Sequence, residues 1–183
     1  MDINSKEYLE EQIDCVDRNF KGRRANYNAE RFTEIRRFCA GSLTILSVGC
    51  GGHEPVSIGA THACDIAPNA EKYLRSLGWD GLFTVCSCTK LPYGDKTFDM
   101  AVCSEVIEHL PTIQDVIETF NELDRVAKRW IVTTPRFKLG KFNPEPTHKR
   151  DFAYKELEVL LKKYKPLIER KGLFFYVKSR GVR

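Results

Sequence analysis

The sequence of 183 residues lacks the features that mark several specialised protein classes. No apolar run approaches the ~20 residues of a transmembrane helix, and residues 1–7 lack the basic and apolar regions of a signal peptide. Hydrophobic residues at 42% and charged residues at 30% do not fit a disordered chain. We therefore expect a cytoplasmic protein without a membrane anchor. It should form one domain over 1–183, with a helical lid at 1–40 and a core at 41–183.

A cysteine framework is also missing. The seven cysteines are odd in number, and the sequence contains no Cys-x-x-Cys pair. Most of them lie in or beside short apolar runs, where a free thiol behaves as a small hydrophobic side chain. Cys86 and Cys88 alternate at a strand end, which leaves a soft-metal site there as the alternative.

The excess of positive charge is small, because 29 Lys and Arg residues face 25 Asp and Glu residues. Basic residues gather at 21–24 and along the tail at 162–183. Solvated helix faces explain such clusters more often than nucleic acid does, so RNA is an alternative partner but not the favoured one. The balance permits a phosphate-bearing partner without requiring it.

Short apolar runs alternate with amphipathic segments along most of the chain. This alternation predicts an α/β fold: a Rossmann-like, doubly wound, mostly parallel sheet flanked by helices. One strand is predicted after the last helix, so we expect a shortened carboxy-terminal edge of the sheet. An exposed edge is compatible with a monomer or a weak homodimer. The predicted strands lie at 43–48, 62–66, 82–86, 98–103, 130–134 and 173–177, and helices are predicted near 4–20, 32–40, 70–77, 113–123 and 157–164.

Glycines follow the first predicted strand, where ligands bind in such sheets. Residues 47–54 read Ser-Val-Gly-Cys-Gly-Gly-His-Glu. Gly49 and Gly51 let the backbone turn tightly and approach a ligand, because they carry no Cβ. Glu54 stands where a dinucleotide fingerprint has a third small residue, which disfavours a nicotinamide-binding dehydrogenase. No Gly-Lys-Ser/Thr follows, which excludes a phosphate-binding loop of that type.

Asp65 is predicted at the tip of the second strand, 16 residues beyond Gly49. A carboxylate at that tip can accept hydrogen bonds from both hydroxyls of a ribose that lies over the glycine turn. The alternative is that Asp65 caps the helix that begins near Pro68.

The most specific pattern lies at residues 91–111, which read Leu-Pro-Tyr-Gly-Asp-Lys-Thr-Phe-Asp-Met-Ala-Val-Cys-Ser-Glu-Val-Ile-Glu-His-Leu-Pro. This stretch resembles the class I S-adenosylmethionine-dependent methyltransferases, in particular their type-11-like branch. Members of that branch read much like Leu-Pro-Phe-x-Asp-x-Ser-Phe-Asp, then an apolar strand, then Glu-x-x-Glu-His. The resemblance covers about residues 43–160. It implies methyl transfer from S-adenosylmethionine to an unidentified small-molecule or phosphate-bearing acceptor, with S-adenosylhomocysteine as the product.

The resemblance also implies which residues hold this cofactor. The glycine turn would pass under the methionine part, the end of the second strand would hold the ribose and adenine, and the end of the fourth strand would lie below the methionine and sulfonium. The implied cofactor-binding residues are Gly49, Cys50 and Gly51 at the turn, Asp65 and Ile66 after the second strand, Ser87 and Cys88 at the adenine edge, and Ser104, Glu105 and Val106 after the fourth strand.

Three features depart from the family's pattern. Ser47 stands where the family usually has an acid two residues before the first glycine, so the methionine ammonium loses one expected influence. Ser87 replaces the acid that commonly contacts the adenine amino group. The link from Gly49 to Asp65 is short, so the first crossover helix must be truncated. These departures motivate an alternative function, a cofactor-binding regulatory module without catalysis.

Two histidines are candidate catalytic bases. Methyl transfer is an in-line displacement, and a base is needed only where the acceptor must lose a proton. His109 and His148 could each accept that proton, because an unperturbed imidazole has a pKa near 6.5. We expect Glu105 to face the cofactor, Glu108 to lie in solvent and His109 to line the acceptor pocket, with no metal.

The alternative is a metal-assisted O-methyltransferase. Glu105, Glu108 and His109 are spaced i, i+3 and i+4, so they would share one face of a helix. Together with His148 they would suit Mg²⁺ or Mn²⁺. This set is similar to the metal site of the small-RNA 2′-O-methyltransferases, and some quinone-precursor O-methyltransferases are similar too. The acceptor would then be an RNA ribose 2′-hydroxyl or a catechol-like group.

Basic side chains could flank the acceptor pocket on both sides. Arg23, Arg24 and Tyr27 of the amino-terminal lid could reach its mouth, but a solvated turn is the favoured interpretation of the two arginines. Lys149 and Arg150 lie in the segment that would form the opposite wall. A basic rim would favour an anionic or phosphate-bearing acceptor.

Overall fold

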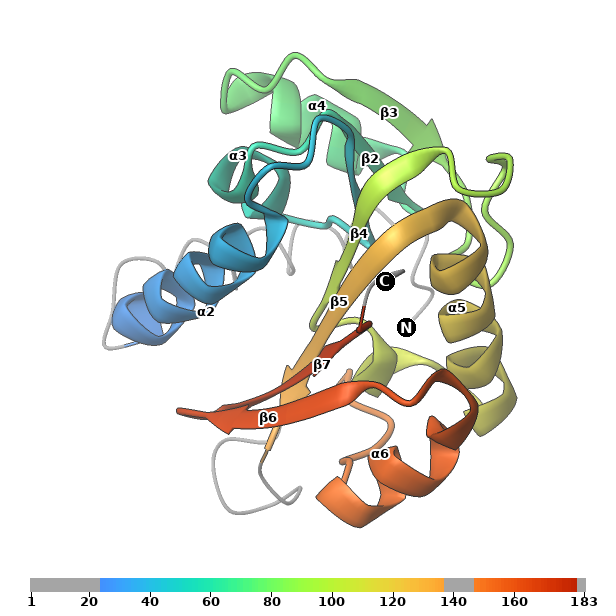
Figure 1. Cartoon of the computed structure of the whole chain (residues 1–183). Coiled ribbons are helices and arrows are strands. Elements are labelled where there is room, and N and C mark those ends of the chain that lie inside the picture. Colours follow the sequence, from blue (N-terminus) through green and yellow to red (C-terminus); the bar gives the residue numbers. More distant parts are fainter. Residues whose placement is uncertain (1–23, 137–146, 181–183) are drawn as a thin grey trace.

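The computed structural model describes residues 24–136 and 147–180 (Figure 1). Its strands form one sheet in the order β3-β2-β1-β4-β5-β7-β6. Neighbouring strands from β3 to β5 are parallel, whereas β7 runs antiparallel to both β5 and β6. This confirms the doubly wound, mostly parallel α/β sheet. The strand order reverses between β1 and β4, which is where such sheets bind ligands.

Most elements lie close to the predicted ones, but the first described helix begins eight residues before the predicted range of 32–40. The strands are β1 (Ile45–Val48), β2 (His62–Asp65), β3 (Leu82–Val85), β4 (Phe98–Ser104), β5 (Ala127–Pro135), β6 (Leu167–Lys171) and β7 (Phe174–Lys178). The helices are α2 (Arg24–Cys39), α3 (Glu54–Ile58), α4 (Asn69–Ser76), α5 (Ile113–Val126) and α6 (Tyr154–Leu160), with 3₁₀ turns η1 (Ile107–His109) and η2 (Lys162–Tyr164).

Helices cover both faces of the sheet (Figure 1). On one face, Phe32 and Ile35 of α2 pack in a buried cluster with Met100 and Ile131 of the central strands. On the other face, α5 and α6 pack against β4 and β5. Side chains alternate along each strand, so adjacent residues of β5 serve opposite layers. Fully burying one such aliphatic side chain contributes about 1.5–3 kcal/mol, and this packing fixes the strand ends that carry the site.

The first crossover helix, α3, has five residues. Its shortness agrees with the short link between Gly49 and Asp65. The helix begins at Glu54 and ends at Ile58, and its C-cap residue, Gly59, has a left-handed φ of 69°. Because α3 starts directly after the glycine turn, its first residue lies next to the end of β1.

The carboxy-terminal edge of the sheet is not shortened, contrary to the sequence-based expectation. Strand β6 pairs antiparallel with β7 and completes the seventh position among the described strands. Its sequence, Leu-Ile-Glu-Arg-Lys, carries three charged residues and therefore does not read as a buried strand. Charges on an edge strand discourage pairing with another chain.

Several expectations lie outside the described residues. The predicted helix near residues 4–20 is one of them, and the side chains of Arg24 and Tyr27 are not described either. The division into a lid at 1–40 and a core thus stays a prediction. Among the helices that the structure describes, none has the length and apolar character needed to cross a bilayer. Of the six described cysteines, all are free thiols and five are buried.

Candidate functional site

The glycine turn packs directly on the segment that follows β4. Gly49 has a φ of 68°, and a Cβ at this position would lie 2.5 Å from Cγ2 of Val106. The backbone N–H groups of Gly49 and Cys50 both donate to the carbonyl oxygen of Cys64, at 2.9 and 3.1 Å. Only glycine fits this combination of left-handed backbone and close approach. The turn therefore brings the ends of β1, β2 and β4 together.

Asp65 lies at the lip of this turn. Its Oδ2 accepts a hydrogen bond from the backbone N–H of Gly51 and its Oδ1 accepts one from Ala67, both at 2.9 Å. Burial raises the pKa of Asp65, and these hydrogen bonds oppose the shift. Each oxygen keeps a second lone pair for a ribose hydroxyl. The capping alternative is not what the structure shows, because Pro68 is the N-cap of α4 and no side chain caps that end.

The two residues predicted to lie at the adenine edge, Ser87 and Cys88, point in different directions. Ser87 is half-buried and its hydroxyl pairs with that of Thr89 at 2.8 Å. Cys88 turns into the core, where its sulfur lies 3.3 Å from the hydroxyl of Thr119. Cys50 is likewise buried, in a cluster that includes Leu74. The two cysteines can therefore offer a cofactor only their backbone, and the cofactor roles of this edge stay predictions.

An arginine from the first described helix reaches the end of β4. Nη1 of Arg31 lies 3.4 Å from Oε2 of Glu105, and the Arg31 side chain is 12% exposed. Its guanidinium stacks over the ring of Phe174 at 4.9 Å. The hydroxyl of Thr133 donates to the other oxygen of Glu105 at 2.9 Å. Burial raises the pKa of Glu105, while Arg31 and Thr133 act in the opposite direction.

Glu54 belongs to the same group. Its Oε1 accepts a 2.7 Å hydrogen bond from the hydroxyl of Ser47, and both side chains are buried. Burial raises the pKa of Glu54 to about 7, against the opposing effects of Ser47 and Arg31. We refer to Arg31, Glu54 and Glu105 as the arginine cluster.

Sequence reasoning did not select Arg31 or Glu54 as site residues. Arg31 lies four residues before Ile35, so a charge on the apolar side of α2 was the available signal. Glu54 served only as a mismatch to a dinucleotide fingerprint. Its proximity to Ser47 depends on how the turn folds back on β1, which spacing alone does not reveal.

A second polar group contains Glu108, His109 and His148, and we refer to it as the histidine cluster. The possible ligand atoms of the three side chains all lie within 4.8 Å of one another. The two imidazole rings meet edge to face with centroids 4.7 Å apart. Within the described part of the chain, the buried Oε1 of Glu108 and Nδ1 of His109 have no hydrogen-bond partner. The cluster therefore offers unsatisfied atoms to a proton or a cation.

Burial sets the charge state of this cluster. It raises the pKa of Glu108 well above its usual range, and the neighbouring Glu105 adds to the shift. Burial also lowers the pKa of His109 to about 4, helped by His148. His109 is consequently neutral at pH 7 and a weaker base than an ordinary imidazole. The expectation that Glu108 lies in solvent is wrong, because its side chain is buried.

The four residues proposed for a metal do not assemble as one set. Glu105 has a left-handed backbone with φ of 59°, and the following 3₁₀ turn begins only at Ile107. Glu105 and Glu108 therefore do not share a helix face. Thr133 contacts Glu105, whereas its neighbour Thr134 donates to Glu108 at 3.0 Å. Since side chains alternate along a strand, the two clusters lie on opposite faces of the sheet.

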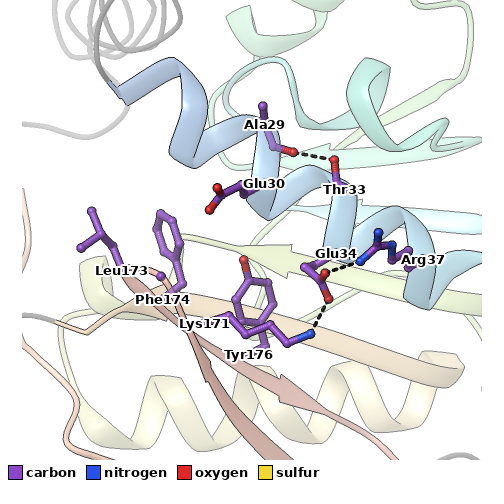
Figure 2. Close-up of a pocket in the computed structure, with 10 residues that line it drawn as sticks. Ala29, Glu30, Thr33, Glu34, Arg37, Lys171, Leu173, Phe174 and Tyr176 are labelled. Atoms are coloured by element: carbon purple, nitrogen blue, oxygen red, sulfur yellow. Dashed lines mark hydrogen bonds and ion pairs between the residues drawn. The ribbon is translucent and has the colours of Figure 1, made fainter.

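A cavity of about 380 Å³ lies beside the arginine cluster, between α2 and the hairpin of β6 and β7 (Figure 2). Phe174 and Tyr176 form its apolar wall, while Glu34 accepts hydrogen bonds from Lys171 at 2.6 Å and Arg37 at 2.8 Å. The Phe174 ring is also the surface on which Arg31 stacks. Phe174 thus contacts both the cavity and the cluster.

The expected basic rim is described only in part. Lys149 is exposed, and its backbone N–H donates to the carbonyl oxygen of Glu108 at 2.8 Å. This end of the segment accordingly lies against η1, the turn that follows β4, and its role as a pocket wall stays a prediction. The Arg150 guanidinium instead donates to the carbonyl oxygen of Pro111 at 3.0 Å. Arg23 lies outside the described residues.

Part of the sequence matches a known protein family. Residues 46–130 match the model of a family described as a methyltransferase domain. No curated protein matches the sequence. The matched segment contains the glycine turn, Asp65 and the residues from Ser104 to His109.

Several solved structures share the fold. A Pyrococcus horikoshii protein has 18% identity and a TM-score of 0.70, with 97% of this chain and 100% of that chain covered. An S-adenosylmethionine-dependent methyltransferase from Thermotoga maritima, a possible histamine N-methyltransferase, has 16% identity and a TM-score of 0.74, with 93% and 97% covered. Magnesium protoporphyrin IX methyltransferase from Synechocystis, solved with bound S-adenosylhomocysteine, has 16% identity and a TM-score of 0.67, with 96% and 94% covered.

Proposed function

We propose that this chain is a class I S-adenosylmethionine-dependent methyltransferase, which the match of residues 46–130 to a methyltransferase-domain family supports. It would methylate a small-molecule or phosphate-bearing acceptor by in-line displacement. The observation that carries the cofactor site is the joint geometry of Gly49 and Asp65. The turn leaves no room for a Cβ, and the Asp65 carboxylate is fixed at its lip.

The chain's main contribution to catalysis is positioning. S-adenosylmethionine supplies a methyl group that is already activated on a sulfonium. Asp65 would hold the ribose, and the Gly49 turn with Val106 would fix the methionine part above the end of β4. Holding the acceptor in line with that methyl group can supply several kcal/mol of the rate enhancement, on the order of 7 or more in well-oriented systems. His109, neutral at pH 7, would accept a proton from a hydroxyl acceptor.

Calorimetric titration of S-adenosylhomocysteine tests this cofactor site. We expect micromolar binding by the wild-type protein and at least tenfold weaker binding by Asp65→Ala, since a hydrogen bond to a charged group contributes about 1.5–3 kcal/mol. Asp80→Ala, an exposed acid between α4 and β3, is the matched control and should bind normally. Absence of binding by the wild-type protein would contradict the proposed function, and binding without methyl transfer to any acceptor would favour a regulatory module.

The phosphate-bearing class of acceptor is supported by Lys149. The backbone of this exposed residue is hydrogen-bonded to Glu108 of the η1 turn that follows β4. Pairs of acceptors that differ only in a phosphate group test the proposal. Lys149→Ala should lower kcat/KM about two- to fivefold for the phosphorylated member, as expected for an exposed ion pair, and leave the other member unchanged. An equal effect on both members would argue against a phosphate at this position.

A metal-assisted O-methyltransferase is the second candidate, and the histidine cluster favours it. One carboxylate and two imidazoles within 4.8 Å suit a divalent transition metal such as Mn²⁺. Glu105 is not part of this set, because it pairs with Arg31. Titration of Mn²⁺ or Mg²⁺ into the protein without cofactor should give heat that His148→Ala abolishes. No heat from either ion would remove this candidate.

Cytoplasmic location and a monomeric or weakly dimeric state stay predictions. Sedimentation velocity across a hundredfold range of concentration checks the latter.

A further inference from the structure

The arginine cluster contains more acid than base. Glu54 and Glu105 approach a single guanidinium, that of Arg31, in a buried region behind the glycine turn. Burying a carboxylate without full compensation is unfavourable. A ligand that brings an additional positive charge would therefore be stabilised beside these carboxyls.

Glu54 is the carboxyl closest to the turn along the chain. It accepts a hydrogen bond from Ser47 at the end of β1 and another from Ser104 at the end of β4. These two strands flank the point where the strand order reverses. The Glu54 carboxyl accordingly lies between the two strand ends over which a ligand on the turn would sit.

Arg31 has hydrogen-bonding capacity that the described residues do not use. Its Nε is buried and, within the described residues, has no hydrogen-bond partner. Its ion pair with Glu105 is long, at 3.4 Å. A guanidinium has five N–H donors in a fork that matches a carboxylate. The cluster thus has spare capacity for one anionic group as well as one cationic group.

We propose that Glu54 binds the ammonium, and Arg31 the carboxylate, of the methionine part of S-adenosylmethionine. This assignment rests on the proposed function and deepens it. The acid expected at position 47 is then supplied from position 54, and Ser47 orients it. An α-amino acid group carries one ammonium and one carboxylate close together. The ammonium would compensate the Glu54 carboxyl, and the carboxylate would accept from the Arg31 Nε that is unpaired among the described residues.

The charge state of Glu54 gives a readout that a purely structural role would not change. The groups that face it are Arg31 from α2, Glu105 after β4, and the thiols of Cys39, Cys50 and Cys103. Burial raises the pKa of Glu54 to about 7. An ammonium beside it would favour the carboxylate, so binding at pH 7 should release about half a proton.

Calorimetry with two ligands tests the assignment. S-adenosylhomocysteine carries the amino acid group, whereas 5′-methylthioadenosine lacks it. Glu54→Gln should weaken binding of S-adenosylhomocysteine at least tenfold and leave binding of 5′-methylthioadenosine unchanged, which also shows that the variant is folded. Arg31→Gln should show the same selectivity. Glu169→Gln, which removes a carboxylate paired with Lys178 on the far strand, is the control and should bind both ligands normally.

Titration in two buffers of different ionisation enthalpy measures the proton release. The wild-type protein should release about half a proton with S-adenosylhomocysteine at pH 7, and Glu54→Gln should release none. The assignment is overturned if Glu54→Gln binds S-adenosylhomocysteine normally or loses both ligands equally. Failure of the wild-type protein to bind either ligand would overturn the proposed function as well, so the two failures are distinguishable.

Discussion

The arginine and histidine clusters differ in how their buried charges are compensated. Both contain residues from the short segment after β4, and both contact neighbouring threonines of β5. In the arginine cluster a guanidinium opposes the carboxyls, and each acid oxygen of Glu105 has a partner. In the histidine cluster Glu108 has a buried oxygen without a partner among the described residues. The first arrangement suits an organic zwitterion, and the second suits a proton or a metal ion.

Gly49→Ala should have the largest effect on the site, because the Gly49 turn packs on Val106. This residue lies between Glu105 of the arginine cluster and Glu108 of the histidine cluster in the sequence. The added Cβ would meet Val106 at 2.5 Å in a left-handed backbone. Strain and overpacking of this kind each cost about 1–3 kcal/mol. We expect a clear fall in melting temperature and loss of measurable S-adenosylhomocysteine binding by calorimetry.

Gly59→Ala is the matched control for that variant. Gly59 has nearly the same φ, 69°, but no atom lies within 4 Å of an added Cβ. It should lose only the stability that the left-handed backbone accounts for and should bind S-adenosylhomocysteine normally. Equal binding defects in both variants would show that backbone strain, and not the contact with Val106, matters.

The pH dependence of stability should reveal the uncompensated acid of the arginine cluster. Burial raises the pKa of Glu54 from 4.5 to about 7. Stability from this group is therefore present below pH 4.5 and is lost as the pH rises through 7, by about 3 kcal/mol at most. Thermal unfolding between pH 5 and 8 should show a melting temperature that falls on the order of 5–10 °C for the wild-type protein.

Glu54→Gln should reduce that slope, because the amide does not titrate. Part of the slope should remain, because burial also raises the pKa of Glu105 and that of Glu108. Glu34→Gln is the control: the hydrogen bond from Lys171 lowers the pKa of Glu34, so its contribution to stability is lost as the pH falls toward that lowered pKa. A slope between pH 5 and 8 that Glu54→Gln leaves unchanged would assign it to another group.

Binding of a divalent metal tests the histidine cluster separately from the arginine cluster. If the histidine cluster binds Mn²⁺, an ion at 100 times its Kd should stabilise the fold by about 2.7 kcal/mol. Thermal shift measurements with and without Mn²⁺ should show this increase in the wild-type protein and in Glu54→Gln, and not in His148→Ala. A shift that survives in His148→Ala would place the ion elsewhere.

The smallest expected effect is a loss of stability without a loss of binding, on removal of the cap of α5. Thr112 and Asp115 form a capping box at the start of α5, with the Thr112 hydroxyl accepting from the Asp115 N–H at 3.1 Å. Thr112→Ala should reduce the free energy of unfolding by about 1 kcal/mol. It should leave S-adenosylhomocysteine affinity unchanged, because this cap contacts neither cluster. A binding defect here would mean that α5 positions the site more directly than the structure indicates.

The sequence predicts the centre of the sheet well because β1, β4 and β5 are mostly buried apolar runs. Asp65 was found in the same way, since a strand tip is a local feature. Strand β6 was missed because its charged residues hide the pattern of an edge strand. Arg31 was missed because its partner Glu105 is 74 residues away, and such long-range contacts depend on how α2 packs. Glu54 was missed because its role depends on the turn.

The left-handed backbone at Glu105 has a consequence for how this segment tolerates change. At Glu105 the direction in which successive side chains point changes its period. Residues before it alternate as in a strand, and residues after it follow the period of a 3₁₀ turn. Inserting or deleting one residue between 104 and 108 would exchange which face each acid serves, even with every side chain retained. The length of this segment is therefore more tightly constrained than the identity of Val106 or Ile107.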